Sequence, residues 1–337
     1  LLILSSPVIK NNSLVKQKNT IAFFTALLFV SHPLATQAVT YIIQRQALMA
    51  AMFFILSLAL YMKGRLMHGK RITKWLLFSG ALLSFILAAL SKENAYTLPF
   101  IIILVEICFL QNKKLRFSFK KPGIILIILA FAGTVLLLLS KFSLDIFDPI
   151  PPSQSMGNAE TITPMNYLLT QFRVIPKYIQ LLILPISQNL DYDIALSQRF
   201  FEVKTMLRFL FLTSLVGLAV YLFNRNRIIS FVIFWFFITL AVESSIVPIT
   251  DVMFEHRTYL PSFGFFIIMS SLIYVLLWKH KHYAALLIVG ILIFYSVKTY
   301  QRNKVWQNDF TLWTDVISKS PDKARPYGNR GVAYSKT

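Results

Sequence analysis

Long apolar runs alternate with short polar loops along this chain. A helix needs about 17–25 apolar residues to cross a bilayer, and nine runs come close to that length: residues 20–36, 46–62, 75–91, 95–111, 122–140, 206–223, 228–247, 259–278 and 283–299. His32 and Pro33 interrupt the first run near its end. Because the pattern repeats along the chain, it predicts an all-α polytopic membrane helix bundle and not a signal peptide.

The loops between these runs form two alternating sets. One set is basic and contains no Asp or Glu, and it comprises residues 10–19, 63–74, 112–121, 224–227 and 279–282. The positive-inside rule places this set in the cytoplasm. The remaining loops, at residues 32–45, 91–95, 141–205 and 244–258, and the tail from residue 300 are then expected on the outer side.

Residues 166–185 are apolar enough to suggest a tenth span. Arg173, Pro176 and Lys177 interrupt them, and a crossing here would move loops 224–227 and 279–282 to the outer side, against the same rule. We therefore expect an amphipathic or re-entrant helix that lies on the outer face.

The composition agrees with a membrane protein. Of 337 residues, 56% are hydrophobic and only 14% are charged, whereas soluble domains carry roughly a quarter charged residues. The net charge of +20 is concentrated in the acid-free loops, so we attribute it to membrane topology and expect no nucleic-acid partner. The single cysteine, Cys108, cannot form an internal disulfide. A Walker-type phosphate loop and a nucleophile elbow are absent from the sequence.

The tail changes in character. Residues 326–334 follow the pattern Pro-Tyr-x-Asn-x-Gly-x-x-Tyr, which is typical of the first helix of a tetratricopeptide repeat. We expect Gly331 to admit the paired helix, and Tyr327 and Tyr334 to pack inside the repeat. Such repeats need neighbours, and the chain begins without Met, so we expect a piece of a longer protein. Its two parts would be a transmembrane domain at 1–299 and an extracytoplasmic linker with the first repeat at 300–337.

Four polar clusters lie at predicted outer ends of spans, where ionisable groups are candidates for function. In the first, His32, Thr36 and Gln37 can share one helical face, and Arg45 follows. A capped helix end with a hydrogen-bonded histidine is the alternative.

The second cluster is Lys92 and Glu93, in a very short turn between two spans. Lys92 could bind a phosphate that Glu93 helps to orient, although an interfacial lysine often only extends to lipid headgroups. The third cluster is Asp191 and Asp193. Two such carboxylates could hold a divalent cation, but this spacing is more common in solvated turns.

The fourth cluster is Glu255, His256 and Arg257, which lead directly into a span. The planar guanidinium of Arg257 suits phosphate, and His256 can exchange a proton near neutral pH. The alternative is a Glu–Arg pair that caps the helix.

These clusters, in this order and followed by a repeat, resemble the type C glycosyltransferases that carry C-terminal tetratricopeptide repeats. That family includes the transmembrane O-mannosyltransferases of the endoplasmic reticulum and their bacterial relatives. The matching stretches are His32-Pro33 with Thr36, Lys92-Glu93, Glu255-x-Arg257-x-x-Leu260-Pro261-Ser262-x-Gly264 with Tyr259, and residues 326–334.

The resemblance implies a glycosyltransferase that uses a polyprenyl-phosphate-linked sugar as donor and a hydroxyl of an extracytoplasmic acceptor, such as a protein. Carried over, Arg257 and Lys92 hold the lipid phosphate, and His256 and Glu255 support it. The other candidates are His32 and Gln37 as supporting residues and Glu93, Arg45 and Tyr259 as substrate-binding residues. The tetratricopeptide repeats would bind the acceptor or another partner protein.

Two features depart from the family. Its acidic first-loop motif lies upstream of Leu1, so the catalytic base cannot be named. The family's Glu after His-Pro-x-x-Thr is Gln37 here, which weakens an acid/base or metal role at that position. We expect no firm cofactor, and Asp191 and Asp193 are weak candidates for a divalent cation.

The resemblance implies a multi-pass protein of the bacterial inner membrane with a periplasmic tail, or of the endoplasmic reticulum membrane in a eukaryote. Two alternatives stay open: a non-catalytic membrane anchor that presents a repeat scaffold for an envelope complex, and a transporter of lipid-linked sugars. A pair of acids in the upstream loop would favour the enzyme, and inverted repeats among the spans would favour the transporter.

The loop charges generate a topology prediction. Reporter fusions at Gly64, Asn226 and Lys281 should report the cytoplasmic side, and a fusion at Arg330 the opposite side, because residues 166–185 do not cross. An outward Asn226 or an inward Arg330 contradicts this topology.

Overall fold

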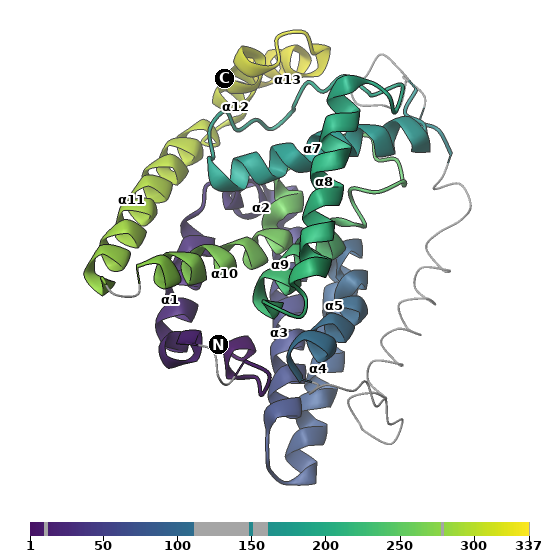
Figure 1. The fold of residues 1–337 in the computed structure, drawn as a ribbon. Coiled ribbons are helices and arrows are strands. Elements are labelled where there is room, and N and C mark those ends of the chain that lie inside the picture. The colour runs from purple at the N-terminus through teal and green to yellow at the C-terminus, as the bar shows by residue number, and fades with distance from the viewer. Residues whose placement is uncertain (10–12, 111–147, 151–160, 278–279, 337) are drawn as a thin grey trace.

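The computed structural model describes residues 1–9, 13–110, 148–150, 161–277 and 280–336 (Figure 1). Its α-helices are α1 Lys18–Ser31, α2 Ala35–Thr40, α3 Arg45–Leu66, α4 Arg71–Ser91, α5 Leu98–Val105, α7 Pro164–Ile183, α8 Val203–Leu222, α9 Arg227–Leu240, α10 Tyr259–Leu276, α11 Lys281–Val305, α12 Asp309–Lys319 and α13 Ala324–Tyr334. β pairing within the described residues is limited to one bridge between Ile150 and Ile162. The predicted all-α bundle is therefore confirmed.

Six helical segments are long and apolar enough to cross a membrane: Ile42–Leu66, Arg71–Ser91, Glu93–Leu110, Val203–Leu222, Glu255–Leu276 and His282–Val305. Each coincides with one of the nine predicted spans. Three of them begin in a 3-10 turn or end in a π turn: η3 Ile42–Gln44 precedes α3, η4 Glu93–Thr97 and η5 Glu106–Leu110 flank α5, and η7 Glu255–Thr258 precedes α10. The multi-pass architecture is therefore confirmed for this part of the chain.

The predicted spans at 20–36 and 228–247 are shorter than expected. A third predicted span, at 122–140, lies outside the described residues. Helix α1 has 14 residues and ends before Pro33, because the residue preceding a proline avoids the helical conformation and His32 is extended. Helix α9 also has 14 residues and ends at Leu240. The chain then turns through residues 241–254, which contain Glu243 and Pro248. The interruption of run 20–36 at His32 and Pro33 was thus expected, whereas the break after Leu240 in the predicted span 228–247 was missed.

Helix α7 is the segment that we predicted to be amphipathic and non-crossing. It is a single 20-residue helix that continues through Pro176, and it is not among the helices apolar enough to span. Figure 1 shows it across the end of the bundle that also carries α2 and α12, which we call the α12 end. The apolar side of α7 buries Val174, Tyr178 and Leu181, and its polar groups face the irregular segment 241–254.

A buried ion pair lies among α3, α5 and η5. The carboxylate of Glu106 accepts from Tyr61 Oη at 2.6 Å and from Arg65 Nη2 at 2.8 Å. Arg227 Nη1 donates to the carbonyl oxygens of Ile107 and Cys108 at 3.2 and 3.3 Å. These two hydrogen bonds fasten the π turn η5 to the start of α9.

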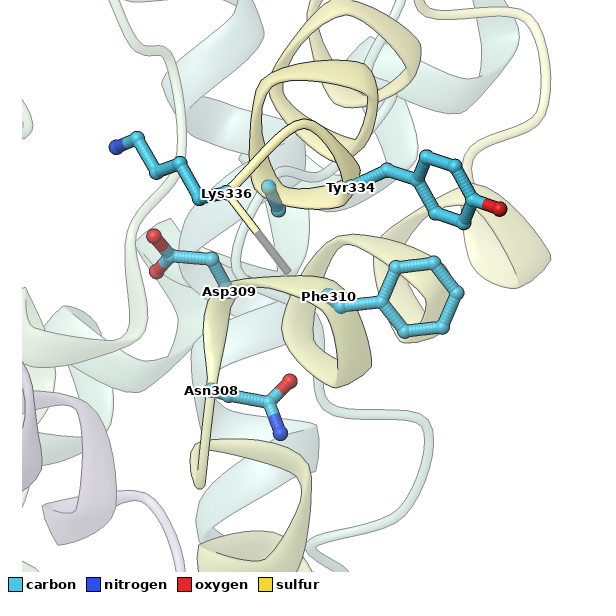
Figure 2. Close-up of a pocket in the computed structure, with 6 residues that line it drawn as sticks. Asn308, Asp309, Phe310, Tyr334 and Lys336 are labelled. Atoms are coloured by element: carbon cyan, nitrogen blue, oxygen red, sulfur yellow. The ribbon is translucent and has the colours of Figure 1, made fainter.

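The tail is a helix pair attached to α11. Helix α11 runs without a break past residue 299 to Val305, so one helix crosses the predicted domain boundary. Figure 2 shows Phe310 of α12 and Tyr334 of α13 projecting to the same side, and their ring centroids are 6.4 Å apart. Tyr327 and Tyr334 are 45% and 72% exposed, and no heavy atom lies within 4 Å of a Cβ at Gly331. The expected packing of these residues inside a repeat is therefore not seen here.

Helices α9 and α10 pack closely through Gly264. A Cβ at this position would lie 2.9 Å from Trp235 Cδ1 and 3.0 Å from Val232 Cγ1, and Trp235 is fully buried and donates to the carbonyl of Leu260 at 3.2 Å. A Gly264→Leu variant should therefore lose about 1–3 kcal/mol of stability through overpacking, measured as a lower melting temperature in detergent. The matched control is Gly290→Leu on α11, where the same atom meets open space. Equal melting temperatures for the two variants would contradict this packing.

Candidate functional site

A cavity of about 460 Å³ opens at the α12 end between three segments of the chain. Its polar walls come from the start of α3, from the turn between α4 and α5, and from residues 241–257. We call it the Lys92 cavity, and its lining includes Gln44, Gln46, Lys92, Glu93, Glu243, Ser245, Thr250, Asp251, His256 and Arg257. Lys92 and Arg257 therefore line one cavity although they are distant in sequence.

Lys92 and Glu243 form the ion pair of this cavity. Their Nζ and Oε1 atoms are 2.6 Å apart, and their side chains are 7% and 10% exposed. The second carboxylate oxygen, Oε2 of Glu243, is buried without a hydrogen-bond partner among the described residues. Separating a buried pair of this kind leaves an uncompensated charge, which costs about 3–5 kcal/mol. The pair fixes the turn after α4 against the segment that follows α9.

Arg257 binds backbone carbonyls. Its Nη1 donates to the carbonyl oxygens of Val252 at 3.1 Å and Glu243 at 3.4 Å and to Tyr167 Oη at 3.2 Å, and its Nη2 donates to the carbonyl of Asp251 at 2.7 Å. The residue is only 3% exposed. Arg257 thus holds the irregular segment 243–252 in place, while its edge contributes to the cavity wall.

Helix α7 supports the same segment from the other side. Tyr167 Oη donates to the carbonyl of Glu243 at 2.8 Å, Gln171 Nε2 donates to that of Val252 at 3.1 Å, and the Phe254 amide donates to Tyr178 Oη at 3.1 Å. Burial raises the pKa of Tyr167 and of Tyr178, so both hydroxyls stay protonated. The polar face of α7 therefore supplies hydrogen-bond partners to the backbone of the irregular segment 241–254.

The neighbours of Arg257 point in different directions. The His256 ring lines the cavity, and its Nδ1 is buried with no hydrogen-bond partner among the described residues. The His256 amide donates to Gln37 Oε1 at 2.7 Å, which brings the first predicted cluster to the fourth. Glu255 points away and accepts from the Asn189 amide at 2.8 Å, from Gln188 Nε2 at 3.0 Å and from Tyr192 Oη at 2.6 Å. Burial and this carboxylate raise the pKa of Tyr192.

Three other predicted residues lie outside the cavity lining. His32 is buried between Phe266 and Tyr295, with Nε2 3.2 Å from the carbonyl of Leu182 and Nδ1 accepting from the Leu34 amide at 3.3 Å. Tyr259 packs against Phe29, and Arg45 is exposed at the start of α3. His32 therefore matches the alternative of a hydrogen-bonded helix end.

Asp191 binds the tail of the chain. Its carboxylate accepts from Lys323 Nζ and from Arg325 Nε, both at 2.7 Å, and it is 3% exposed. Asp193 is exposed. No group of three or more His, Cys, Asp or Glu side chains that could hold a metal ion occurs in the described ranges, so we derive no step through a metal.

Arg325 connects the tail to the cavity wall. Its Nη2 donates to Asp251 Oδ1 at 2.8 Å, and Asp251 lines the Lys92 cavity. Nearby, Ser320 Oγ donates to the carbonyl of Asp191 and Lys319 Nζ donates to that of Gln188, at 2.8 and 2.7 Å. The helix pair α12–α13 is therefore fastened over the cavity by buried and half-buried ion pairs.

Two cavity residues, Glu243 and Asp251, were missed as site residues. The predicted span at 228–247 contained Glu243, and an acidic residue inside an apolar span is itself a signal of function. Asp251 lies four residues before the fourth cluster and was given no role. Lys323 and Arg325 gave no sequence signal, because their partner Asp191 is more than 130 residues away.

Sequence comparison supports the resemblance drawn from the motifs. The chain is similar to protein O-mannosyl-transferases. It is 26% identical to one from Caenorhabditis elegans over 322 residues, which cover 92% of this chain and 43% of the relative. It is 23% identical to human TMTC3 over 343 residues, which cover 94% of this chain and 37% of the relative. It is 27% identical to Drosophila melanogaster Tmtc3 over 383 residues, which cover 96% of this chain and 40% of the relative. The predicted resemblance to the O-mannosyltransferases is thus confirmed, and the tetratricopeptide repeats stay a prediction.

The chain spans about two fifths of the length of these relatives. No protein-family profile matches it, and no solved structure matches it.

The contacts of the tail generate a prediction. Asp191→Asn should leave the buried ammonium of Lys323 without its carboxylate partner, at a cost of about 3–5 kcal/mol, while Arg325 keeps Asp251. The change should therefore loosen α12 and α13. Amide hydrogen exchange in these helices, followed by mass spectrometry, should then accelerate at least tenfold. The exposed Asp193→Asn is the matched control and should leave exchange unchanged. Unchanged exchange in Asp191→Asn contradicts the fastening.

Proposed function

We propose that this chain is the membrane part of a glycosyltransferase that moves a sugar from a polyprenyl-phosphate-linked donor to a hydroxyl of an acceptor protein. The names of the relatives suggest mannose as the sugar. The observation that carries the proposal is the Lys92 cavity, where Lys92, from the turn after α4, meets His256 and Arg257 of η7 at the end of the membrane-spanning helices.

The chemistry of the leaving group supports this use of the cavity. Breaking the bond between sugar and lipid phosphate leaves negative charge on the phosphate, and a fixed cation in a partly dehydrated site stabilises that charge. Lys92 is such a cation. In the unliganded protein its charge is balanced by Glu243, which the donor phosphate would replace as the partner of Nζ. The unpartnered Nδ1 of His256 offers a further polar atom to the ligand.

Arg257 has a different role in this proposal from the one the sequence suggested. We expected it to be the stronger phosphate ligand, but its Nη atoms are directed at three carbonyl oxygens and a tyrosine. We therefore assign it as a positioning residue that shapes the cavity. An Arg257→Lys variant should lose most of this function, since one ammonium cannot reproduce a planar fork with several donors.

Orientation and partners complete the proposal. The α12 end faces the periplasm of a bacterial inner membrane, or the lumen in a eukaryote, because the described acid-free loops 63–74 and 224–227 lie at the opposite ends of their helices. The helix pair α12–α13 would begin the repeats that bind the acceptor. A non-catalytic anchor with the same fold is the alternative that the experiment must distinguish.

The test uses the full-length protein in liposomes with a labelled polyprenyl-phosphate mannose and its acceptor. Lys92→Gln should lower transfer at least tenfold, because a charge-assisted contact contributes about 1.5–3 kcal/mol. It should also destabilise the protein, because the buried carboxylate of Glu243 loses its cationic partner. The double variant Lys92→Gln with Glu243→Gln restores a neutral hydrogen-bonding pair, so it should recover the melting temperature but not the transfer rate.

Lys70→Gln is the matched control, since Lys70 is exposed at the other end of α4 and should not affect transfer. Full transfer by the double variant would show that Lys92 is only a structural partner of Glu243. Absence of transfer by the wild-type protein, with every donor sugar tried, would favour the non-catalytic anchor.

A further inference from the structure

A second polar cavity lies between α7, α8 and the segment that joins them. It has a volume of about 430 Å³ and is lined by Arg173, Lys177, Tyr192, Asp193, Ile194, Ala195 and Arg208. None of these is in the lining of the Lys92 cavity. Three cations thus surround one cavity with a single carboxylate, and we call it the α7–α8 cleft.

The cations of the cleft are held there by the fold. Arg173 Nη1 donates to the carbonyl of Ala195 at 3.0 Å and to Ser197 Oγ at 3.2 Å, which fixes its guanidinium at the wall. Its Nε is buried without a hydrogen-bond partner among the described residues. Phe209, next to Arg208, packs on Phe172 and Phe200 with ring centroids 5.0 and 5.1 Å apart. Like charges repel at short range, so an anion bound among the three cations would stabilise this arrangement.

The position of the cleft indicates where that anion comes from. Arg208 is the sixth residue of the span α8, about 7–8 Å along the helix from its start, and a cation at that depth of a span lies near lipid headgroups. Exposed apolar side chains lie near it: Phe211, one turn along α8, is 43% exposed, Leu207 is 57% exposed, and Phe201, just before the helix, is 82% exposed. Acyl chains can lie along this face of α8 while a headgroup reaches the cations.

We propose that the α7–α8 cleft binds the phosphate headgroup of an anionic phospholipid. Arg173 and Arg208 supply guanidinium groups, which match phosphate oxygens in pairs, and Lys177 supplies a third charge. Clustered cations at a membrane surface attract anionic headgroups. The bound lipid ties the non-crossing helix α7 to the membrane beside α8. It also lies beside Tyr192, whose hydroxyl donates to Glu255.

The probes are short-chain phosphatidylglycerol, short-chain phosphatidylcholine and inorganic phosphate, added to the delipidated full-length protein in neutral detergent. Phosphatidylglycerol should raise the melting temperature, with an apparent affinity at least tenfold above that for phosphatidylcholine. Arg208→Gln and Lys177→Gln should each lower that affinity several-fold, and rising salt should weaken it. Neither side chain holds the backbone of the cleft, so both variants should fold.

Arg225→Gln is the matched control, because Arg225 follows the opposite end of α8. Equal affinity for the two lipids would overturn the proposal. So would a loss of phosphatidylglycerol affinity in Arg225→Gln equal to that in the cleft variants. An equal response to inorganic phosphate would reassign it to a free anion. Competition by a polyprenyl phosphate at equal concentration would assign the cleft to the donor and also overturn the proposal. None of these outcomes depends on transfer activity, so the proposed function is tested separately.

Discussion

The buried guanidinium of Arg257 is the interaction on which the α12 end depends. Helix α9 stops after 14 residues, and the chain runs through residues 241–254 before α10 begins. Irregular backbone near the membrane needs donors for its carbonyl oxygens, because no bulk water is available to them. Arg257 binds three of these carbonyls, and Tyr167 and Gln171 of α7 add two more hydrogen bonds. Loss of these donors would leave the cavity wall without a fixed shape.

The same solution recurs elsewhere in the bundle. Arg227 donates to two carbonyls of the π turn η5, and Glu106 in that turn is neutralised by Arg65 and Tyr61. Charged groups in an apolar bundle are stable only when they are paired. The irregular segment after α9 is therefore held by Arg257, and the π turn η5 by Arg65 of α3 and Arg227 of α9.

The tail is part of this electrostatic arrangement. Asp191 and Asp251 come from two different loops, and Arg325 contacts both. Since Asp251 lines the Lys92 cavity, the position of α13 and the shape of that cavity are physically linked. In the proposed transferase this link would place an acceptor-binding domain directly over the donor phosphate. Such contact requires no flexible linker, because α11 continues without a break to Val305.

The sequence by itself determined the helices and the approximate site. Apolar run length is a local property, so six spans and the amphipathic α7 were predicted with nearly their observed bounds, and the clusters around Lys92 and Arg257 were found because ionisable groups are rare in spans. The interruption after α1 was visible at His32 and Pro33, but the break after α9 was missed, because the apolar run continues through it and Pro248 comes only later.

The tertiary structure alone decided which charges meet. Glu243 pairs with Lys92 and Asp191 with Lys323 across more than 120 residues in each case, and no periodicity encodes such partners. It also decided that Arg257 holds carbonyls, that Asp191 binds the tail, and that Arg173, Lys177 and Arg208 surround one cleft. A side chain's type sets what it can bind, but its available partners depend on how the helices pack, because hydrogen bonds and ion pairs act only over a few ångströms.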